Sequence, residues 1–304
     1  MSRSSLVALV LLSTFAVAQQ QAAPPAAQAQ QFSTNLVQRE ESPTYSDLYC
    51  AGFLTHEGIG KTNLIAGGLN TPAQTQFTRG TLVYVGGGGL QEGQQYSVVR
   101  ELHDPNRYEA FTGARAAVDA AGQPYAELGR IRVTGVRGGT AIADIEFSCQ
   151  NMTVGDIVIP FREHPQITYR KDTNFQRFPS GGSHLSGRIV MAREFDQEVG
   201  RGQKVYLDIG SGKGVKVGDY FRVVRGYDPD KINPVDNLSY HAPSGEDTQK
   251  YPGNVTKEEA KNLPIRSLGE IIILSVTSTS ATGMITNSLE NIEVGDYVEL
   301  EDAQ

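Results

Sequence analysis

Short runs of apolar residues alternate with polar ones along most of the chain, and glycine-containing turns separate the runs. Residues 220–224 (Tyr-Phe-Arg-Val-Val) and 269–273 (Gly-Glu-Ile-Ile-Ile) show the pattern, in which β-branched and aromatic side chains dominate. Such runs are typical of β-strands with one buried face. The Gly-Asp steps at Gly155, Gly218 and Gly295 suit hairpin turns, which need a residue with positive φ. The pattern therefore predicts an all-β protein.

The strand-like runs recur in two halves of the chain. Residues 128–158 match residues 268–298 without a gap at an offset of about 140, and roughly twelve of these positions are identical. Three segments further upstream also match: 80–85 with 202–207, 93–100 with 218–225 and, more weakly, 50–54 with 185–189. Each half therefore contains six strand-like segments in the same order.

The repeat predicts two modules, residues 46–161 and 183–302. They are joined by a linker at 162–182, which contains Pro, Asn and a Pro-Ser-Gly-Gly turn. Six strands with one buried face each would leave exposed edges unless the sheet closes on itself. We therefore expect two tandem small six-stranded β-barrels.

The loops between the third and fourth strands differ most between the two modules. This loop covers residues 101–127 in the first module and 226–267 in the second. The Ala-rich residues 110–121 predict a helix in the first loop, and residues 257–261 predict a short helical turn in the second. Long loops on a small barrel commonly carry recognition. The candidate partner-binding residues in the second loop are Tyr227, Tyr240, His241 and Tyr251.

The N-terminus has the features of a secretory signal. Arg3 precedes an uncharged apolar run at 6–12, and Ala16-Val17-Ala18 is a small-x-small cleavage site, so residues 1–18 are predicted to be a signal peptide. Residues 19–42 are mostly Gln, Ala and Pro and predict a disordered tether. No later stretch is long and apolar enough to span a bilayer, so we expect no transmembrane segment in the mature chain. We expect a periplasmic location, with secretion or association with the outer membrane left open.

Composition narrows the classes of partner. The formal net charge is −7, and removal of Arg3 with the signal makes it one unit more negative. This balance argues against a surface for nucleic acid or anionic membranes, which need clustered Lys and Arg. The 33 glycines and 13 tyrosines, with no tryptophan, agree with an all-β protein rich in tight turns.

The second module carries a recognisable pattern. Residues 202–207 read Gly-x-x-Val-Tyr-Leu and 214–225 read Gly-Val-Lys-Val-Gly-Asp-x-Phe-x-Val-Val-Arg; further on, 268–276 read Leu-Gly-Glu-Ile-x-Ile-x-x-Val and 292–296 read Ile-Glu-Val-Gly-Asp. This pattern resembles the C-terminal domain of the flagellar assembly protein T family, here present as two tandem copies. The resemblance implies a six-stranded β-barrel and a periplasmic place near the flagellar basal body. The chain lacks the α/β domains that precede this barrel in the flagellar protein. The periplasmic β-domains of the cell-shape protein MreC are a weaker match.

Motifs for catalysis or cofactor binding are incomplete. Residues 210–214 (Gly-Ser-Gly-Lys-Gly) look like a phosphate loop, but Gly rather than Ser or Thr follows the Lys. A calcium site remains an alternative for three nearby aspartates, Asp228, Asp230 and Asp236. Their spacing does not match that of a Ca²⁺-binding loop. The five histidines show no metal-ligand spacing, and we expect them in surface loops. We therefore predict a protein that is not an enzyme and has no cofactor or metal.

Two pairs of residues are expected to be structural. Tyr84 and Tyr206 occupy matching strand positions and are expected in core or cross-strand packing. Cys50 and Cys149 are the only cysteines, and an even number in an exported protein indicates a disulfide. They match Leu185 and Leu289 in the second module, so we expect both to face the core. A bond between them would close a loop of about 100 residues and stabilise the module by up to about 4–5 kcal/mol in the chain-entropy model. Two buried free thiols are the alternative.

The features together predict an exported structural or adaptor protein of a bacterial cell envelope. Its barrel loops would dock onto an envelope protein assembly, of the flagellar type if the resemblance holds. The alternative function is a periplasmic module that binds peptidoglycan or an exported polysaccharide. The aromatic residues of the 226–267 loop would then stack on sugars, although the lack of tryptophan weighs against this function.

Overall fold

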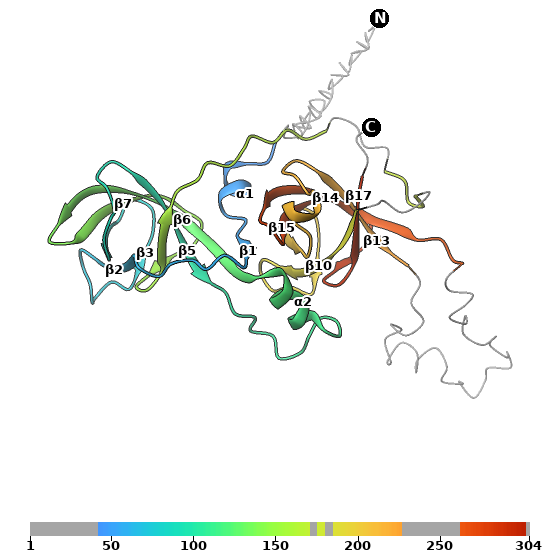
Figure 1. Ribbon diagram of the computed structural model, residues 1–304, viewed down its shortest axis with the longest axis horizontal. Helices are drawn as coiled ribbons and strands as arrows, with labels where there is room; N and C mark the ends of the chain where they lie inside the picture. Colours follow the sequence, from blue (N-terminus) through green and yellow to red (C-terminus); the bar gives the residue numbers. More distant parts are fainter. Residues whose placement is uncertain (1–41, 171–174, 180–184, 227–261, 302–304) are drawn as a thin grey trace, which may run out of the picture. The chain divides into compact units, whose positions relative to one another are not determined.

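The computed structural model describes residues 42–170, 175–179, 185–226 and 262–301, and these form two closed six-stranded β-barrels (Figure 1). The first barrel has the cyclic order β2 (Leu64–Gly68), β4 (Leu82–Gly86), β7 (Thr140–Ser148), β6 (Gln123–Arg137), β5 (Gln95–Glu101) and β9 (Ile157–Pro160). The second has the cyclic order β10 (Ser186–Ala192), β12 (Lys204–Leu207), β15 (Ala281–Ser288), β14 (Arg266–Val276), β13 (Tyr220–Arg225) and β17 (Tyr297–Leu300). All neighbouring strands are antiparallel, and the predicted all-β class with tandem barrels is confirmed.

Smaller elements accompany each barrel. A two-stranded ribbon lies beside each one: β3 (Gln76–Phe77) with β8 (Met152–Thr153), and β11 (Glu198–Val199) with β16 (Ile292–Glu293). The remaining elements are α1 (Tyr45–Tyr49), β1 (Phe53–Thr55), α2 (Ala114–Ala121) and the 3₁₀ turn η1 (Ser211–Lys213). The helix expected within 110–121 is therefore present as α2, whereas 257–261 lie outside the described residues. No helix in the described ranges is long and apolar enough to cross a membrane.

The two barrels repeat each other down to their irregularities. Gly93 donates its N–H to Val133, and Gly218 donates to Ile273 at the matching place. Matching register shifts break the same strand pairs: Val98/Val99 and Val223/Val224, Arg130/Ile131 and Glu270/Ile271, Val133/Gly135 and Ile273/Ser275. The predicted matches of 80–85, 93–100 and 128–158 with the second half are confirmed. A bulge has no reason to recur at equivalent positions unless both copies share one backbone plan.

One predicted match was wrong. The strand equivalent to β10 is β2, because Ile65 and Ile189 each donate their N–H to the carbonyl of the turn aspartate, Asp156 or Asp296, at 2.9 Å. Residues 50–54 therefore do not match 185–189, and they lie outside the first barrel. Strand β2 was not recognised because its sequence, Leu-Ile-Ala-Gly-Gly, contains small residues that give no strand-like alternation. The strand also has a bulge between Ile65 and Gly67.

Each barrel interior is filled by side chains from alternating strand positions. In the first barrel these include Ile65, Val83, Val98, Leu128, Ile131, Ile145 and Val158, and in the second Ile189, Val205, Phe221, Val223, Ile271, Ile285 and Val298. Close strand approach also fixes a glycine in each barrel. A Cβ on Gly129 would lie 2.1 Å from the carbonyl oxygen of Phe147, and one on Gly269 would lie 2.4 Å from that of Asn287.

Candidate functional site: the junction between the barrels

Residues 44–55, here called the N-terminal arm, extend the first barrel. Thr44 caps α1, since its hydroxyl accepts the N–H of Asp47 while Asp47 accepts the N–H of Thr44. Strand β1 then pairs with the beginning of β6, where Phe53 lies opposite Tyr125 and their rings stack. The arm is therefore held along the edge of the first barrel, beyond the closed ring.

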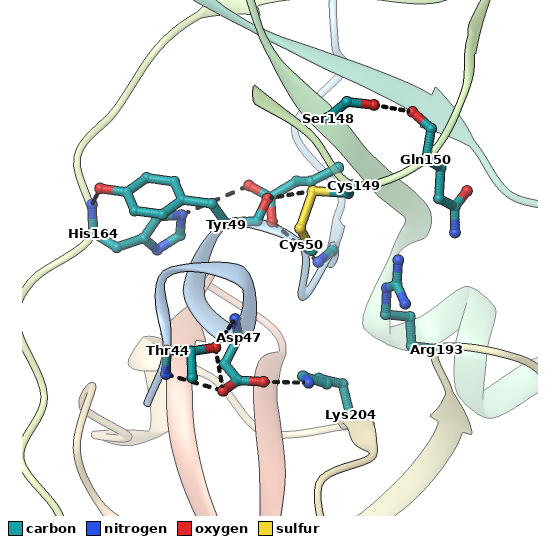
Figure 2. The surroundings of a disulfide bond; sticks show 12 residues. Thr44, Asp47, Tyr49, Cys50, Ser148, Cys149, Gln150, His164, Arg193 and Lys204 are labelled. Atoms are coloured by element: carbon teal, nitrogen blue, oxygen red, sulfur yellow. Dashed lines mark hydrogen bonds and ion pairs between the residues drawn. A yellow bond between two sulfur atoms is a disulfide. The ribbon is translucent and has the colours of Figure 1, made fainter. Parts of the chain in front are cut away.

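A disulfide ties the arm to the first barrel. Cys50 and Cys149 are bonded, with their Cα atoms 5.6 Å apart, which confirms the predicted pairing (Figure 2). The expected location was wrong, because neither position faces the core. Cys50 follows α1 in the arm, Cys149 lies in the turn after β7, and Leu289 at the equivalent turn is 51 % exposed. The disulfide therefore links the N-terminal arm to the first barrel and does not link two strands of the barrel to each other.

Backbone carbonyls of the arm accept hydrogen bonds from the outer face of the second barrel. The Tyr206 hydroxyl donates to Ala51 at 3.0 Å, Thr282 Oγ1 donates to Gly52 at 2.9 Å, and Ser280 Oγ donates to Leu54 at 2.8 Å. All three bonds are buried. Burial raises the pKa of Tyr206, so this hydroxyl stays protonated and keeps its role as a donor. Buried polar groups on both sides are thus satisfied across the junction.

Apolar side chains surround these hydrogen bonds. Leu54 and Ala121 of the first module pack with Val190, Met191 and Tyr206 of the second. Ala51 packs in a second cluster with Ile167, Ile272, Leu274 and Met284. Tyr206 is therefore buried as expected, but on the outside of its barrel, whereas its match Tyr84 is only half-buried.

Charged and aromatic groups flank the junction on the side of α1. Lys204 donates to Asp47 at 2.5 Å (Figure 2). Burial would raise the pKa of Asp47, but the hydrogen bonds from Lys204 and Thr44 outweigh it and hold that pKa below its ordinary value. His164 packs edge-on against the Tyr49 ring and lies 3.6 Å from a Glu127 oxygen. His164 is only 18 % exposed, so the expectation of a surface-loop histidine was wrong at this position.

The first module's long loop also reaches the second barrel. Asn106 Nδ2 donates to the carbonyl of Phe195 at 2.9 Å, and the Phe111 ring lies 3.8 Å from the guanidinium carbon of Arg188. A cavity of about 300 Å³ lies between this loop, α2 and the β10–β11 segment. Its lining includes His103, Asp104, Tyr108, Glu109, Asp119 and Met191. The 101–127 loop thus contributes to the junction within the chain, and its role in recognition stays a prediction.

A second feature, an arginine–aspartate clamp, occurs once in each barrel. Arg100 makes two hydrogen bonds to Asp156, at 2.7 and 2.8 Å, and Arg225 makes the same pair of bonds to Asp296. Each aspartate also accepts the N–H of the residue three positions earlier, and each arginine donates to a turn carbonyl. Sequence reasoning treated the Gly-Asp steps only as turns. The presence of the same Arg and Asp at matching positions of the two copies was the signal that could have predicted the clamp.

The remaining predicted sites are the long loop of the second module, the glycine-rich turn at 210–214 and possible metal sites. Tyr227, Tyr240, His241 and Tyr251 lie outside the described residues, as do Asp228, Asp230 and Asp236. In the 210–214 turn, Ser211 and Gly212 donate their N–H groups to the carbonyls of Thr277 and Ser278, so these amides serve the fold. Within the described ranges, no three metal-ligating side chains lie close enough to hold an ion.

No protein-family model matches the chain, and no curated protein matches it.

Proposed function

We propose that the chain is an exported, non-enzymatic structural adaptor of a bacterial cell envelope, which presents two barrels as one rigid unit to a periplasmic protein assembly. The observation that carries the proposal is the junction. Three buried hydrogen bonds, two apolar clusters and a disulfide-fastened arm join the barrels. A fixed spacing between two binding modules suits a protein that sets the distance between partners.

The disulfide supports the cellular location. Disulfides persist in oxidising compartments such as the periplasm and are rare in the bacterial cytosol. The Cys50–Cys149 bond therefore agrees with the signal-like residues 1–18. Mass spectrometry of the protein recovered from cells tests this part: a mature chain beginning at Gln19 is expected, and an intact Met1 in the soluble cytoplasmic fraction would contradict it.

The binding part is tested by photocrosslinking in intact cells. A photoreactive residue at an exposed position such as Tyr297 or Val154 is expected to capture a discrete envelope protein. A matched probe at buried Ile131 should capture nothing. Capture at Ile131 as well as at the surface, or no captured protein from any exposed position, would contradict the adaptor role.

A peptidoglycan- or polysaccharide-binding role is the second candidate, and the cavity beside α2 favours it. Tyr108 is 74 % exposed there, and carboxylates of Asp104, Glu109 and Asp119 line the same space. An exposed aromatic face with nearby hydrogen-bond acceptors suits sugars. Sedimentation with purified sacculi distinguishes the two functions. Retention that is lost in a Tyr108→Ala variant supports glycan binding, whereas a protein that stays in the supernatant supports the adaptor.

A further inference from the structure

We propose that the cavity between α2 and the second barrel binds a basic side chain, arginine or lysine, of the protein partner. This inference rests on the adaptor function and adds the chemistry by which the partner is recognised. A glycan in the same cavity is the competing occupant, and the experiment is designed to separate the two.

The cavity lies where the two modules meet, and its volume of about 300 Å³ is at the lower end of the range for ligand sites. Figure 1 shows α2 beside β10 of the second barrel. The second barrel contributes buried apolar side chains, here called the floor: Val190, Met191, Ala192 and Val294. A space of this size suits one side chain better than an extended polymer.

The walls of the cavity are held in place by hydrogen bonds within the chain. Both carboxylate oxygens of Glu109 accept backbone N–H groups, from Gly113 at 3.1 Å and from Arg115 at 3.2 Å. Asn106 fixes the carbonyl of Phe195, whose φ of 61° is a conformation that bulky residues rarely adopt. A cavity that is already formed costs less ordering when a ligand binds.

The lining of the cavity is acidic. Arg115 is the single arginine or lysine among the described residues that line it, and its guanidinium donates to the carbonyls of Asn106 and Arg107. Four carboxylates line the same space: Asp104, Glu109, Asp119 and Asp196. This excess of negative charge favours a ligand that carries positive charge.

Three of these carboxylates keep oxygens that the fold does not use. Asp104 accepts the N–H of Asn106 with one oxygen, and Asp196 accepts a hydrogen bond from Gln203 Nε2 with one. Asp119 has no hydrogen bond or ion pair with any residue in the described ranges. The free oxygens are acceptors only, whereas guanidinium and ammonium groups are donors only, so the two match.

The apolar floor decides which cation fits. Arginine and lysine side chains bury their aliphatic stems on apolar surface and keep the charged end at a polar edge. Val190 and Met191 are buried and would contact the stem, whereas Asp104 and Asp119 are exposed and would receive the charged end. A sugar ring carries hydroxyl groups around its edge, and those placed over this floor would lack hydrogen-bond partners. A basic side chain therefore fits the cavity better than a glycan does.

The test uses the purified chain that begins at Gln19, which keeps three methionines in three different places. Met191 lies on the floor of the cavity, Met152 in the core of the first barrel and Met284 in another apolar cluster. The methionine methyl groups are labelled with ¹³C and followed by NMR during titration with an acetylated and amidated peptide, Gly-Leu-Arg-Leu-Gly. The Met191 signal is expected to shift, while those of Met152 and Met284 stay in place. A matched peptide with citrulline in place of arginine has nearly the same shape without the charge, and should bind at least about tenfold more weakly.

Two variants test the acidic rim. A protein carrying both Asp104→Asn and Asp119→Asn is expected to bind the arginine peptide at least about tenfold more weakly, because two charged acceptors are lost. Asp144→Asn is the matched control, since Asp144 is also exposed but lies on the first barrel away from the cavity, and its affinity should be unchanged. Thermal unfolding checks that both variants are folded.

Three results would overturn the proposal: no shift of the Met191 signal, equal binding of the citrulline peptide, or an equal loss of affinity in Asp144→Asn. A fourth is a Met191 signal that moves with an oligomer of N-acetylglucosamine and not with the arginine peptide, because it would assign the cavity to a glycan. Photocrosslinking from Tyr297 tests the adaptor function separately, since Tyr297 does not line this cavity. A partner captured there, together with a cavity that ignores the peptide, would contradict this inference and leave the adaptor function standing.

Discussion

At the scale of single residues, the two copies of the repeat share specific polar interactions as well as a pattern of apolar positions. Asp156 and Asp296 are nearly buried carboxylates, and each is satisfied by a two-pronged arginine and a backbone N–H. Such charge-assisted pairs are stronger and more directional than neutral hydrogen bonds. Because each clamp fixes the turn before the last strand of its barrel, it sets the register with which the ring closes.

Removing one arginine tests the clamp. Arg100→Met leaves the Asp156 carboxylate buried without its main partner, and we expect a loss of about 2–4 kcal/mol in the free energy of unfolding. Chemical denaturation measures the change. The control is Lys61→Met, whose exposed ion pair with Glu101 should contribute nothing measurable. Equal effects of the two substitutions would show that the clamp is no more than a surface ion pair.

The matching tyrosines provide an internal comparison. Tyr206→Phe leaves the buried Ala51 carbonyl without its donor and should cost about 1–2 kcal/mol of stability. Tyr84→Phe makes the same chemical change at the matching strand position, where the hydroxyl has no hydrogen bond to any residue that the structure describes, and should leave the free energy of unfolding unchanged. If both substitutions cost the same, the hydroxyl of Tyr206 does not stabilise the junction.

The Asp47–Lys204 pair makes the junction sensitive to acid. The pKa of Asp47 is lowered in the folded protein, so its contribution is complete above the unfolded pKa of about 4 and is lost as the pH falls through the folded value. Asp47→Asn should therefore cost about 0.5–1 kcal/mol at pH 7. At pH 3 the variant and the wild type should approach the same stability in urea titrations. A difference that persists undiminished at pH 3 would contradict this account.

At the scale of elements, the N-terminal arm is the segment that makes two barrels into one unit. It pairs with β6 of the first barrel, is fastened by Cys50–Cys149, and offers three carbonyls to the second. The disulfide keeps this short segment in place although it has only a three-residue strand and a single helical turn of its own.

Breaking the disulfide should loosen the arm before it affects either barrel. A Cys50→Ser, Cys149→Ser double variant is expected to lose about 2–5 kcal/mol of stability, as is usual when a native disulfide is removed. Hydrogen exchange should then accelerate at Gly52 in the arm, whose N–H donates to Glu127 of β6, but not at Val223 in the core of the second barrel. Equal acceleration at both positions would mean that the arm has no separate role.

Elements with strong local patterns could be predicted from the sequence, whereas elements defined by long-range contacts could not. The strands around Val133 and Ile273 recur at a fixed offset and were found. Strand β2 was missed because its two glycines and one alanine give no alternation. The arm was mistaken for that strand, since Phe53-Leu54 reads as β-type but pairs only with an extension of β6. The Cys50–Cys149 pair was predicted correctly, although both cysteines were wrongly expected to face the core of the barrel.

At the scale of the whole molecule, duplication explains both the fold and the junction. Two barrels of one plan differ in what covers their outer faces. The second barrel's face carries Val190, Met191, Ile272, Leu274 and Met284 beneath the arm, whereas the first barrel has Arg132, Thr134 and Asp144 at positions equivalent to the last three. The difference between apolar and polar residues at these positions is visible in the sequence. The strand register is needed to show that these residues lie on the outer faces of the barrels.

By the proposed function, the arm and the junction join the two barrels into one rigid unit. Differential scanning calorimetry of the chain that begins at Gln19 tests it most directly. The account predicts a single transition whose calorimetric enthalpy equals the van't Hoff enthalpy, because neither barrel can unfold without exposing the shared clusters. Two separate transitions, or a calorimetric enthalpy about twice the van't Hoff value, would show that the barrels unfold independently and would contradict the claim.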